Sequence, residues 1–197
     1  MESTREALRR QLQDSRKAMP QQMARQDSEA ICQRIAPLLQ QCKHIAIYIA
    51  FGREVNVESL LSFFAANDQC AYVPIVMPEN RMMFAPIDEH TPTKLNQYGI
   101  KEPEVDSSLF VKSRQLDAVV VPLVGFDEQC NRMGMGGGYY DRCFARKLDD
   151  IKAPALIGAA YESQCVETVH AQSWDVPLDY VVTESRVICN RVNPSVA

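Results

Sequence analysis

Short, nearly all-apolar runs recur along the chain and alternate with segments that have the periodicity of helices. The runs that we expect to form strands are HIAIYIAF at 44–51, CAYVPIV at 70–76, LDAVVVPLV at 116–124 and APALIGAAY at 153–161, with RMMFAPI at 81–87 as an added strand. Continuous apolar runs of this length are typical of strands covered on both faces. Helices are expected between them, from about Val57 to Asn67 and from about Tyr139 to Leu148. This alternation predicts an α/β fold with a mainly parallel central sheet flanked by helices.

The N-terminal segment has the pattern of two helices. Ser3 and Glu6 have the S-x-x-E spacing of a capping box, which predicts a helix from about Thr4 to Ala18. Pro20 suits the first turn of a second helix that continues toward Gln41. The apolar stripe of this second helix comprises Met23, Ala24, Ile31, Ile35 and Leu38. We therefore expect a helical N-terminus.

The sequence contains no pattern that marks a second domain, and we expect one domain over residues 1–197. Within it we place N-terminal helices at 1–42, an α/β core at 43–190 and a tail at 191–197. DYVVT and RVICN near the end of the core are expected to form one or two short edge strands. Residues 88–114 are polar and contain two prolines, so they are expected to leave the sheet as an excursion.

Composition and charge narrow the class of protein. A net charge of -4 and a pI near 5.4 argue against nucleic acid as the main partner, because phosphate backbones are bound by basic surfaces. The N-terminus has no apolar signal region, and no run approaches the roughly 20 apolar residues of a membrane span. The seven cysteines form no C-x-x-C pair, which favours reduced thiols. We expect a cytoplasmic, monomeric protein that acts on small molecules and binds neither nucleic acid nor membrane.

The segment NRMGMGGGYYDR at 131–142 carries the clearest chemical signal, because four of five successive residues are glycine. Glycines let backbone N–H groups turn inward around phosphate oxygens, and a following helix contributes its positive end. The segment is not a Walker A loop, and it fails G-x-G-x-x-G because Tyr139 occupies the place of the third glycine. A turn that only requires positive φ angles is the alternative interpretation.

Five further positions have two interpretations each, one functional and one structural. Asp141 follows the glycines and could hold magnesium or pair with the helix dipole. Arg5 and Arg9 lie on one helical face and could clamp phosphates or form a solvated basic face. Glu54 follows the first strand, where ligands of open α/β sheets bind, or it starts a helix. Trp174 is expected in the core rather than at a surface where it would be a binding platform.

Five segments together carry a resemblance that spans most of the chain. They are REALR near the N-terminus, YIAFGRE after the first strand, GIKEP at 99–103, VVVPLVGFDEQCNRMGMGGGYYDR, and WDVPLDYVVT. In order and spacing they resemble the 5-formyltetrahydrofolate cyclo-ligase family, also called methenyltetrahydrofolate synthetase. The glycine loop with its preceding PLVGFDE is the specific part.

The resemblance implies an enzyme that converts 5-formyltetrahydrofolate, with or without a polyglutamate tail, to 5,10-methenyltetrahydrofolate with ATP as co-substrate and Mg²⁺ as cofactor. ATP would phosphorylate the formyl oxygen, and N10 of the folate would close the ring, giving ADP and phosphate. The protein would mainly position the reactants and neutralise charge. Tyr139, Tyr140 and Glu54 are candidates for a general base by location only.

The resemblance also implies three sets of site residues. The ATP-binding set is Arg5, Arg9, Arg132, Met133, Gly134, Met135, Gly136, Gly137, Gly138, Tyr139 and Tyr140. The substrate-binding set is Ile49, Glu54, Met135, Gly136, Gly137, Gly138 and Tyr139. The magnesium ligands are Asp141 and, as a second ligand, Asp179.

The chain departs from the family pattern in the charge of the loop. Met135 and Gly137 stand where some members have basic residues, and Arg5 stands where lysine is common. Phosphate binding would then depend more on Arg132, Arg142 and the N-terminal arginines. A non-catalytic module that binds nucleotide or folate is the second hypothesis, and a kinase or dinucleotide oxidoreductase is disfavoured by the absent Walker A and Rossmann motifs.

Overall fold

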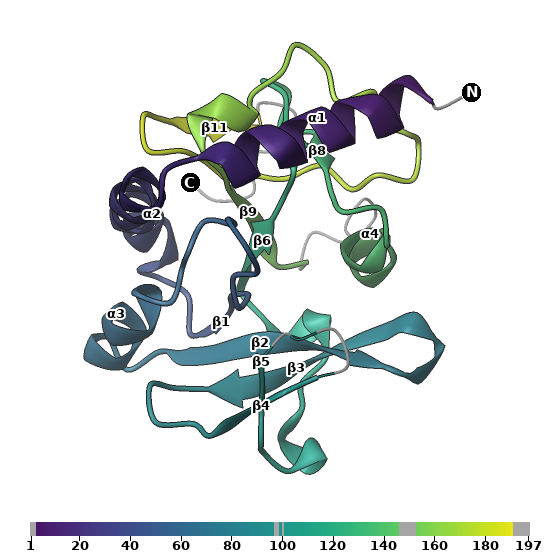
Figure 1. The fold of residues 1–197 in the computed structure, drawn as a ribbon. Coiled ribbons are helices and arrows are strands. Elements are labelled where there is room, and N and C mark those ends of the chain that lie inside the picture. Colours follow the sequence, from purple (N-terminus) through teal and green to yellow (C-terminus); the bar gives the residue numbers. More distant parts are fainter. Residues whose placement is uncertain (1–2, 97–98, 100, 146–152, 191–197) are drawn as a thin grey trace.

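The computed structural model describes residues 3–96, 99, 101–145 and 153–190, and a seven-stranded sheet forms its centre (Figure 1). The strands are β1 (His44–Ala46), β2 (Cys70–Met77), β3 (Arg81–Ile87), β6 (Ala118–Pro122), β9 (Ala155–Ala159), β10 (Tyr180–Val182) and β11 (Val187–Cys189). Their order is β11-β10-β9-β6-β1-β2-β3. The inner strands pair in parallel, and the two edge strands are antiparallel to their neighbours. The predicted α/β fold with a mainly parallel sheet is confirmed.

Four α-helices and several one-turn helices surround the sheet in the described part of the chain. The α-helices are α1 (Thr4–Ala18), α2 (Gln21–Ile35), α3 (Leu60–Ala66) and α4 (Tyr139–Phe144). The 3-10 turns are Ala36–Leu39, Pro78–Asn80, Ser107–Leu109, Ser113–Gln115 and Glu162–Gln164. Two small hairpins pair β4 (Thr93–Leu95) with β5 (Lys101–Pro103) and β7 (Gly125–Phe126) with β8 (Arg132–Met133). The first of these lies in the expected excursion.

The helical N-terminus follows the sequence pattern with one difference. The capping box is present, because the Ser3 hydroxyl accepts from the Glu6 N–H and the Glu6 carboxylate accepts from the Ser3 N–H. The second helix, however, ends at Ile35 and tightens into the 3-10 turn Ala36–Leu39. Pro37 lacks an N–H and its ring clashes with the preceding turn, so the α-helix does not reach Gln41 as predicted.

Two strand predictions need correction. The first strand pairs only over His44–Ala46; Ile47 still donates to the carbonyl of Tyr72, and the chain then leaves the sheet to line a pocket. The segment DYVVT was expected at an edge, but β10 lies between β9 and β11, and β11 forms the edge. The predicted helix from Tyr139 extends to Phe144 as an α-helix, and the end expected at Leu148 lies outside the described residues.

Strand residues alternate between two buried layers, since successive side chains of a strand point to opposite faces. Val120 belongs to a core cluster with Ile35 of α2 and Phe64 of α3. Its neighbour Val121 belongs to a second cluster with Phe144 of α4 on the opposite face. The sheet is therefore covered on both sides, as its continuous apolar strands predict.

The order of the inner strands creates a switch point between β1 and β6. From β1 the chain moves to β2 on one side, and it later returns through β6, β9 and β10 on the other. Crevices at the carboxyl ends of strands at such a point are the usual ligand sites of open α/β sheets. Helix α1 lies against this end of the sheet, where Arg16 donates a hydrogen bond to the carbonyl of Leu123, one residue after β6 (3.1 Å).

Candidate functional site

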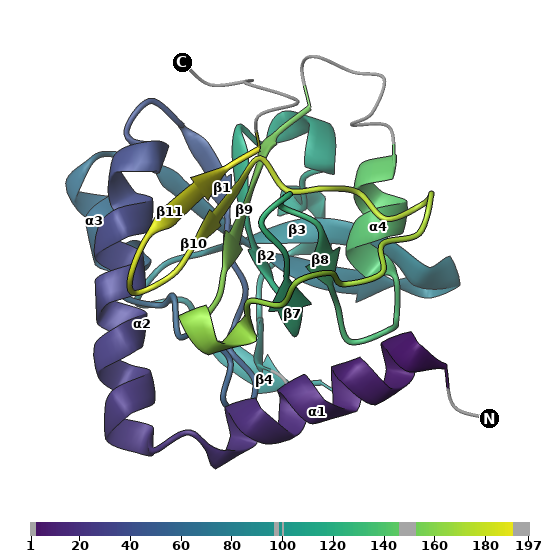
Figure 2. The same ribbon diagram turned by 90° about the horizontal axis from the view of Figure 1, so that it is seen from above.

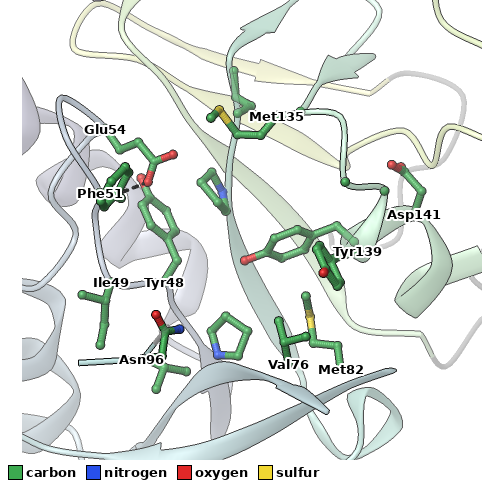
Figure 3. Close-up of a pocket in the computed structure, with 18 of the residues that line it drawn as sticks. Tyr48, Ile49, Phe51, Glu54, Val76, Met82, Asn96, Met135, Tyr139 and Asp141 are labelled. Atoms are coloured by element: carbon green, nitrogen blue, oxygen red, sulfur yellow. Dashed lines mark hydrogen bonds between the residues drawn. The ribbon is translucent and has the colours of Figure 1, made fainter. Parts of the chain in front are cut away.

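A cavity of about 580 Å³ lies at the carboxyl ends of the central strands (Figure 3). It is lined by the segment after β1, the second half of β2, the end of β6, the glycine loop and the start of α4. The predicted site residues that line it are Ile49, Glu54, Arg132, Gly134, Met135, Gly137, Gly138, Tyr139, Tyr140 and Asp141. Residues that are far apart in the sequence are thus brought together in one pocket.

The glycine loop joins β8 to α4 and requires glycine at two points. Gly136 has a φ of 99° and Gly138 a φ of 63°, a region that other residues rarely adopt. Gly138 is the residue that precedes α4. The positive φ angles that the turn interpretation requires are therefore present, and the loop also faces the pocket through Gly134, Gly137 and Gly138. Phosphate binding by the loop stays a prediction.

Helix α1 packs against this loop and brings a positive charge to it. Arg9 donates from Nε to the carbonyl of Gly134 (3.0 Å), and its guanidinium carbon lies 3.7 Å from the place that a Cβ on Gly136 would occupy. One turn further along, Gln13 donates to the sulfur of Met135 (3.2 Å). The loop itself carries little charge, and α1 supplies the cation.

Arg5 makes a different contact from the one expected of it. Its Nη2 forms an ion pair with Asp175 (2.6 Å), and both side chains are largely buried. Arg5 is not among the residues that line the pocket. The structure therefore places Arg5 at the segment before β10, beside the region of the glycine loop but bound to a carboxylate.

Asp141 and Arg132 form a buried pair at the wall of the pocket. Arg132 is 3% exposed and donates from Nη2 to Oδ1 of Asp141 (2.7 Å). The same Oδ1 accepts from the N–H of Val176 (3.2 Å), and Nη1 of Arg132 donates to the carbonyl of Val176. Oδ2 of Asp141 makes no hydrogen bond to the part of the chain that the structure describes. This oxygen gives the carboxylate a position from which it could bind a hard cation.

Asp179, the second expected metal ligand, lies at the start of β10 and does not line the pocket. It is 3% exposed, and its Oδ2 accepts from the backbone N–H of Leu156 on the neighbouring strand (2.6 Å). Its backbone N–H donates to the carbonyl of the same residue. This carboxylate joins two strands, so a metal site in the pocket depends on Asp141.

Glu54 is held in the pocket by two contacts. Its Oε2 accepts from the N–H of Phe51 (3.0 Å), and its Oε1 lies 3.7 Å from Nη2 of Arg16, with both side chains about a tenth exposed. Burial raises the pKa of Glu54 above its ordinary value of 4.5, and the Phe51 hydrogen bond and the Arg16 charge partly offset this effect. The carboxylate is an acceptor aimed into a mostly apolar cavity (Figure 3).

The two tyrosines at the start of α4 have different surroundings. The ring of Tyr140 stacks on Phe144 with centroids 6.3 Å apart. Burial, and next the charge of Glu54, raise the pKa of Tyr140 well above its ordinary value. Tyr140 therefore stays protonated at neutral pH, and its hydroxyl can donate a hydrogen bond to a ligand. The guanidinium of Arg142 lies over the ring of Tyr139, 5.0 Å from its centroid.

Several residues of the pocket were not singled out from the sequence. Tyr48, Leu123 and Met82 lie in segments for which the sequence pattern predicts strands and no site residue. Asn96 and Lys101 come from the excursion, and GIKEP marked that segment without a role. The signal that could have identified Arg16 is its spacing on α1, because it lies seven residues after Arg9 and hence on nearly the same helical face.

Comparison with known proteins decides the family. The sequence profile described as the 5-formyltetrahydrofolate cyclo-ligase family matches residues 1–184. The chain belongs to this family. The 5-formyltetrahydrofolate cyclo-ligase of Haemophilus influenzae is 32% identical over 178 residues, covering 88% of this chain and 94% of that protein. The cyclo-ligase of Escherichia coli K12 is 31% identical over 145 residues, covering 73% of this chain and 79% of that protein.

Solved structures of cyclo-ligases have the same fold. The 5,10-methenyltetrahydrofolate synthetase of Aquifex aeolicus superimposes with a TM-score of 0.82 at 25% identity, covering 99% of this chain and 97% of that one. The synthetase of Mycoplasma pneumoniae gives a TM-score of 0.72 at 26% identity, covering 92% and 99%. The resemblance seen in the five sequence segments is thus confirmed at the level of family and fold. Within the described residues, no helix combines the length and apolarity needed to cross a bilayer.

Proposed function

We propose that this cyclo-ligase family member converts 5-formyltetrahydrofolate to 5,10-methenyltetrahydrofolate with ATP and Mg²⁺. The observation that carries the proposal is that Glu54 and the glycine loop line one cavity of about 580 Å³. A volume of this order suits a ligand of the size of a folate. A pocket that holds an acceptor for a heterocycle beside a loop for phosphates is what phosphoryl transfer to a folate requires.

The folate half of the pocket comprises the segment after β1 and the facing strands. The N–H groups of a pterin ring can donate to the carboxylate of Glu54, and such a charge-assisted hydrogen bond is stronger than a neutral one. Ile49 and Phe51 offer apolar surface beside it (Figure 3). The substrate's formyl group would then face the glycine loop.

The phosphate half comprises the glycine loop and the charges around it. Backbone N–H groups of Gly136 to Gly138 and the guanidinium of Arg9 would bind phosphate oxygens. The pocket wall adds the carboxylate of Asp141, which Arg132 holds in place. Asp141 would hold Mg²⁺ together with phosphate and water oxygens, and the ion would neutralise charge on the phosphates.

The reaction needs no nucleophile from the protein. The formyl oxygen attacks the γ-phosphorus of ATP and ADP leaves; N10 then attacks the activated formyl carbon, and phosphate departs as the ring closes. The N10 proton is released to solvent or to a nearby acceptor. The chain's part is to hold the two substrates in line, and Tyr140, which stays protonated, can donate to a developing negative oxygen.

The loop's low charge does not favour the non-catalytic alternative. Met135 and Gly137 replace basic residues of some relatives, but α1 places Arg9 beside Gly136. A cation is therefore present at the loop from another element. A monomeric state and a cytoplasmic location stay predictions from the sequence.

The proposal is tested by incubating the purified protein with 5-formyltetrahydrofolate, ATP and Mg²⁺ while recording the near-ultraviolet band of the methenyl product. We expect the band to grow only with all three present, with one ADP formed per methenyl group. Reactions without ATP, or with EDTA in place of Mg²⁺, are the controls. Folate binding without growth of the band would instead support a non-catalytic module.

Replacing Glu54 with glutamine should weaken folate binding in a pH-dependent way. Loss of a charge-assisted hydrogen bond costs about 1.5–3 kcal/mol, which corresponds to a roughly 10- to 150-fold higher Kd. Because burial raises the pKa of Glu54, the wild-type carboxylate becomes protonated as the pH falls through a value above 4.5. The affinity of the wild-type protein for folate should therefore fall as the pH is lowered through the pKa of Glu54. The affinity of Glu54→Gln for folate should not depend on pH in this way.

Equilibrium titration of both proteins with 5-formyltetrahydrofolate between neutral and acidic pH measures the effect. Glu58→Gln is the matched control, because Glu58 is exposed, lies four residues away and does not line this pocket. It should keep the wild-type affinity and pH profile. Equal affinities of wild type and Glu54→Gln at neutral pH would remove Glu54 from the folate site.

A further inference from the structure

The single tryptophan of the chain lies on the surface, contrary to the expectation that it belongs to the core. Trp174 is 67% exposed, in the segment that connects β9 to β10. Figure 2 shows this segment running past the β7–β8 hairpin toward α4 and back to β10. An indole ring exposed to this degree leaves a large aromatic face available to a ligand.

The backbone beside Trp174 is fixed by hydrogen bonds to the candidate site. Asp175 accepts from Nη2 of Arg5 (2.6 Å) and from the N–H of Gln172 (2.9 Å). The N–H of Val176 donates to Asp141, and its carbonyl accepts from Arg132. Trp174 is therefore presented next to a segment that is anchored to the pocket wall at Val176 and to α1 at Asp175.

The same contacts place this segment beside the phosphate loop. Arg5 and Arg9 lie one turn apart on α1, which corresponds to an axial rise of roughly 6 Å. Arg9 contacts the carbonyl of Gly134 in the loop, while Arg5 contacts Asp175, the residue after Trp174. A nucleotide whose phosphates bind the loop can extend along this face of α1 toward the indole ring.

We propose that Trp174 is the stacking platform for the purine base of ATP. The inference rests on the proposed function, because it takes the phosphates to lie in the glycine loop. Aromatic stacking on a base is tolerant of direction and needs one exposed ring, which Trp174 supplies from a backbone that the contacts of Asp175 and Val176 anchor. Arg5 supports this subsite by holding Asp175 in place. This role explains why the guanidinium of Arg5 pairs with a carboxylate and does not point to the phosphates.

Fluorescence gives a direct test that does not depend on turnover. Since Trp174 is the only tryptophan in the sequence, indole emission reports on this position alone. We expect ATP with Mg²⁺ to quench and shift the emission with saturation, and inorganic tripolyphosphate, which has phosphates but no base, to bind without this change. Unchanged emission at ATP concentrations that calorimetry shows to saturate the protein would overturn the proposal.

Kinetics give the second test. Removal of base stacking should raise the KM for ATP roughly 5- to 150-fold in Trp174→Ala with kcat retained, and Trp174→Phe should restore most of the loss. Leu109→Ala removes a similarly exposed apolar side chain (55%) elsewhere and is the matched control. A KM for ATP in Trp174→Ala within twofold of the wild-type value would contradict the proposal.

The two proposals fail separately. If the wild-type protein forms no methenyl product, the proposed function is wrong, and the fluorescence titration still decides whether a purine base stacks on Trp174. If the wild-type protein turns over and Trp174→Ala binds ATP equally well, only the stacking platform is wrong. Thermal unfolding of Trp174→Ala should match wild type, because the side chain is mostly exposed.

Discussion

Asp141→Asn should lower turnover about 10²- to 10³-fold while the protein stays folded. The substitution keeps an oxygen that can accept from Arg132 and Val176, but it removes the negative charge that a Mg²⁺ ion would need. We therefore expect the Mg²⁺ concentration for half-maximal activity to rise as well. The rate of methenyl formation as a function of Mg²⁺ concentration measures both effects.

Asp141→Ala provides the contrast. It also leaves the buried guanidinium of Arg132 without its partner, and loss of one member of such a pair costs about 3–5 kcal/mol. Because Asp141 is 24% exposed, the loss should lie at the lower end of this range. We therefore expect the free energy of unfolding to fall by about 3 kcal/mol. Denaturant unfolding separates the variants. Wild-type turnover and Mg²⁺ dependence in Asp141→Asn would exclude this carboxylate from the metal site.

Gly136→Val should reduce turnover at least about 10²-fold. Gly136 has a φ of 99°, and a β-branched side chain there costs about 1–3 kcal/mol of strain. A Cβ at this position would also lie 3.7 Å from the guanidinium carbon of Arg9, so the valine methyl groups would enter the space that we propose for the phosphates. Displacement of a reactant by about 1 Å can cost 10²-fold in rate. Steady-state kinetics with varied ATP measure the loss.

Gly134→Ala is the control within the same loop. The backbone of Gly134 has no positive φ, and an added Cβ would meet no atom within 4 Å. Its free energy of unfolding should stay within about 0.5 kcal/mol of wild type. If Gly136→Val were as active and as stable as Gly134→Ala, both the backbone strain at Gly136 and the phosphate position beside it would be excluded.

The fold was predictable where local pattern and burial agree. The strands β2, β6 and β9 are continuous apolar runs, of which β6 and β9 are buried on both faces and β2 over most of its length, and the capping box at Ser3 fixes the start of α1. The sequence pattern led to wrong predictions where tertiary contacts determine the place or the end of an element. DYVVT is as short as an edge strand, yet β11 pairs with its outer side. Pro37 ends α2 early although the apolar stripe continues past it.

The glycine loop of the candidate site could be predicted from the sequence, whereas the contacts that orient the other site residues could not. The glycines with Asp141 and Glu54 stand out in sequence because their residue types fit phosphate, metal and heterocycle chemistry. The partners that orient them do not stand out, since the pairs of Arg5 with Asp175 and Arg16 with Glu54 join residues far apart in the chain. The exposure of Trp174 also follows from tertiary packing and not from hydrophobicity.

Helix α1 touches both halves of the pocket, and this has a thermodynamic consequence. Its 15 residues form a rod about 22 Å long, which contacts the phosphate loop through Arg9 and the Glu54 carboxylate through Arg16. Under the proposed function, a shift of the rod caused by one substrate would be transmitted to the binding region of the other. Linkage then requires that any effect of ATP on the affinity for folate be matched by an equal effect of folate on the affinity for ATP, so the two substrates would act as reciprocal effectors.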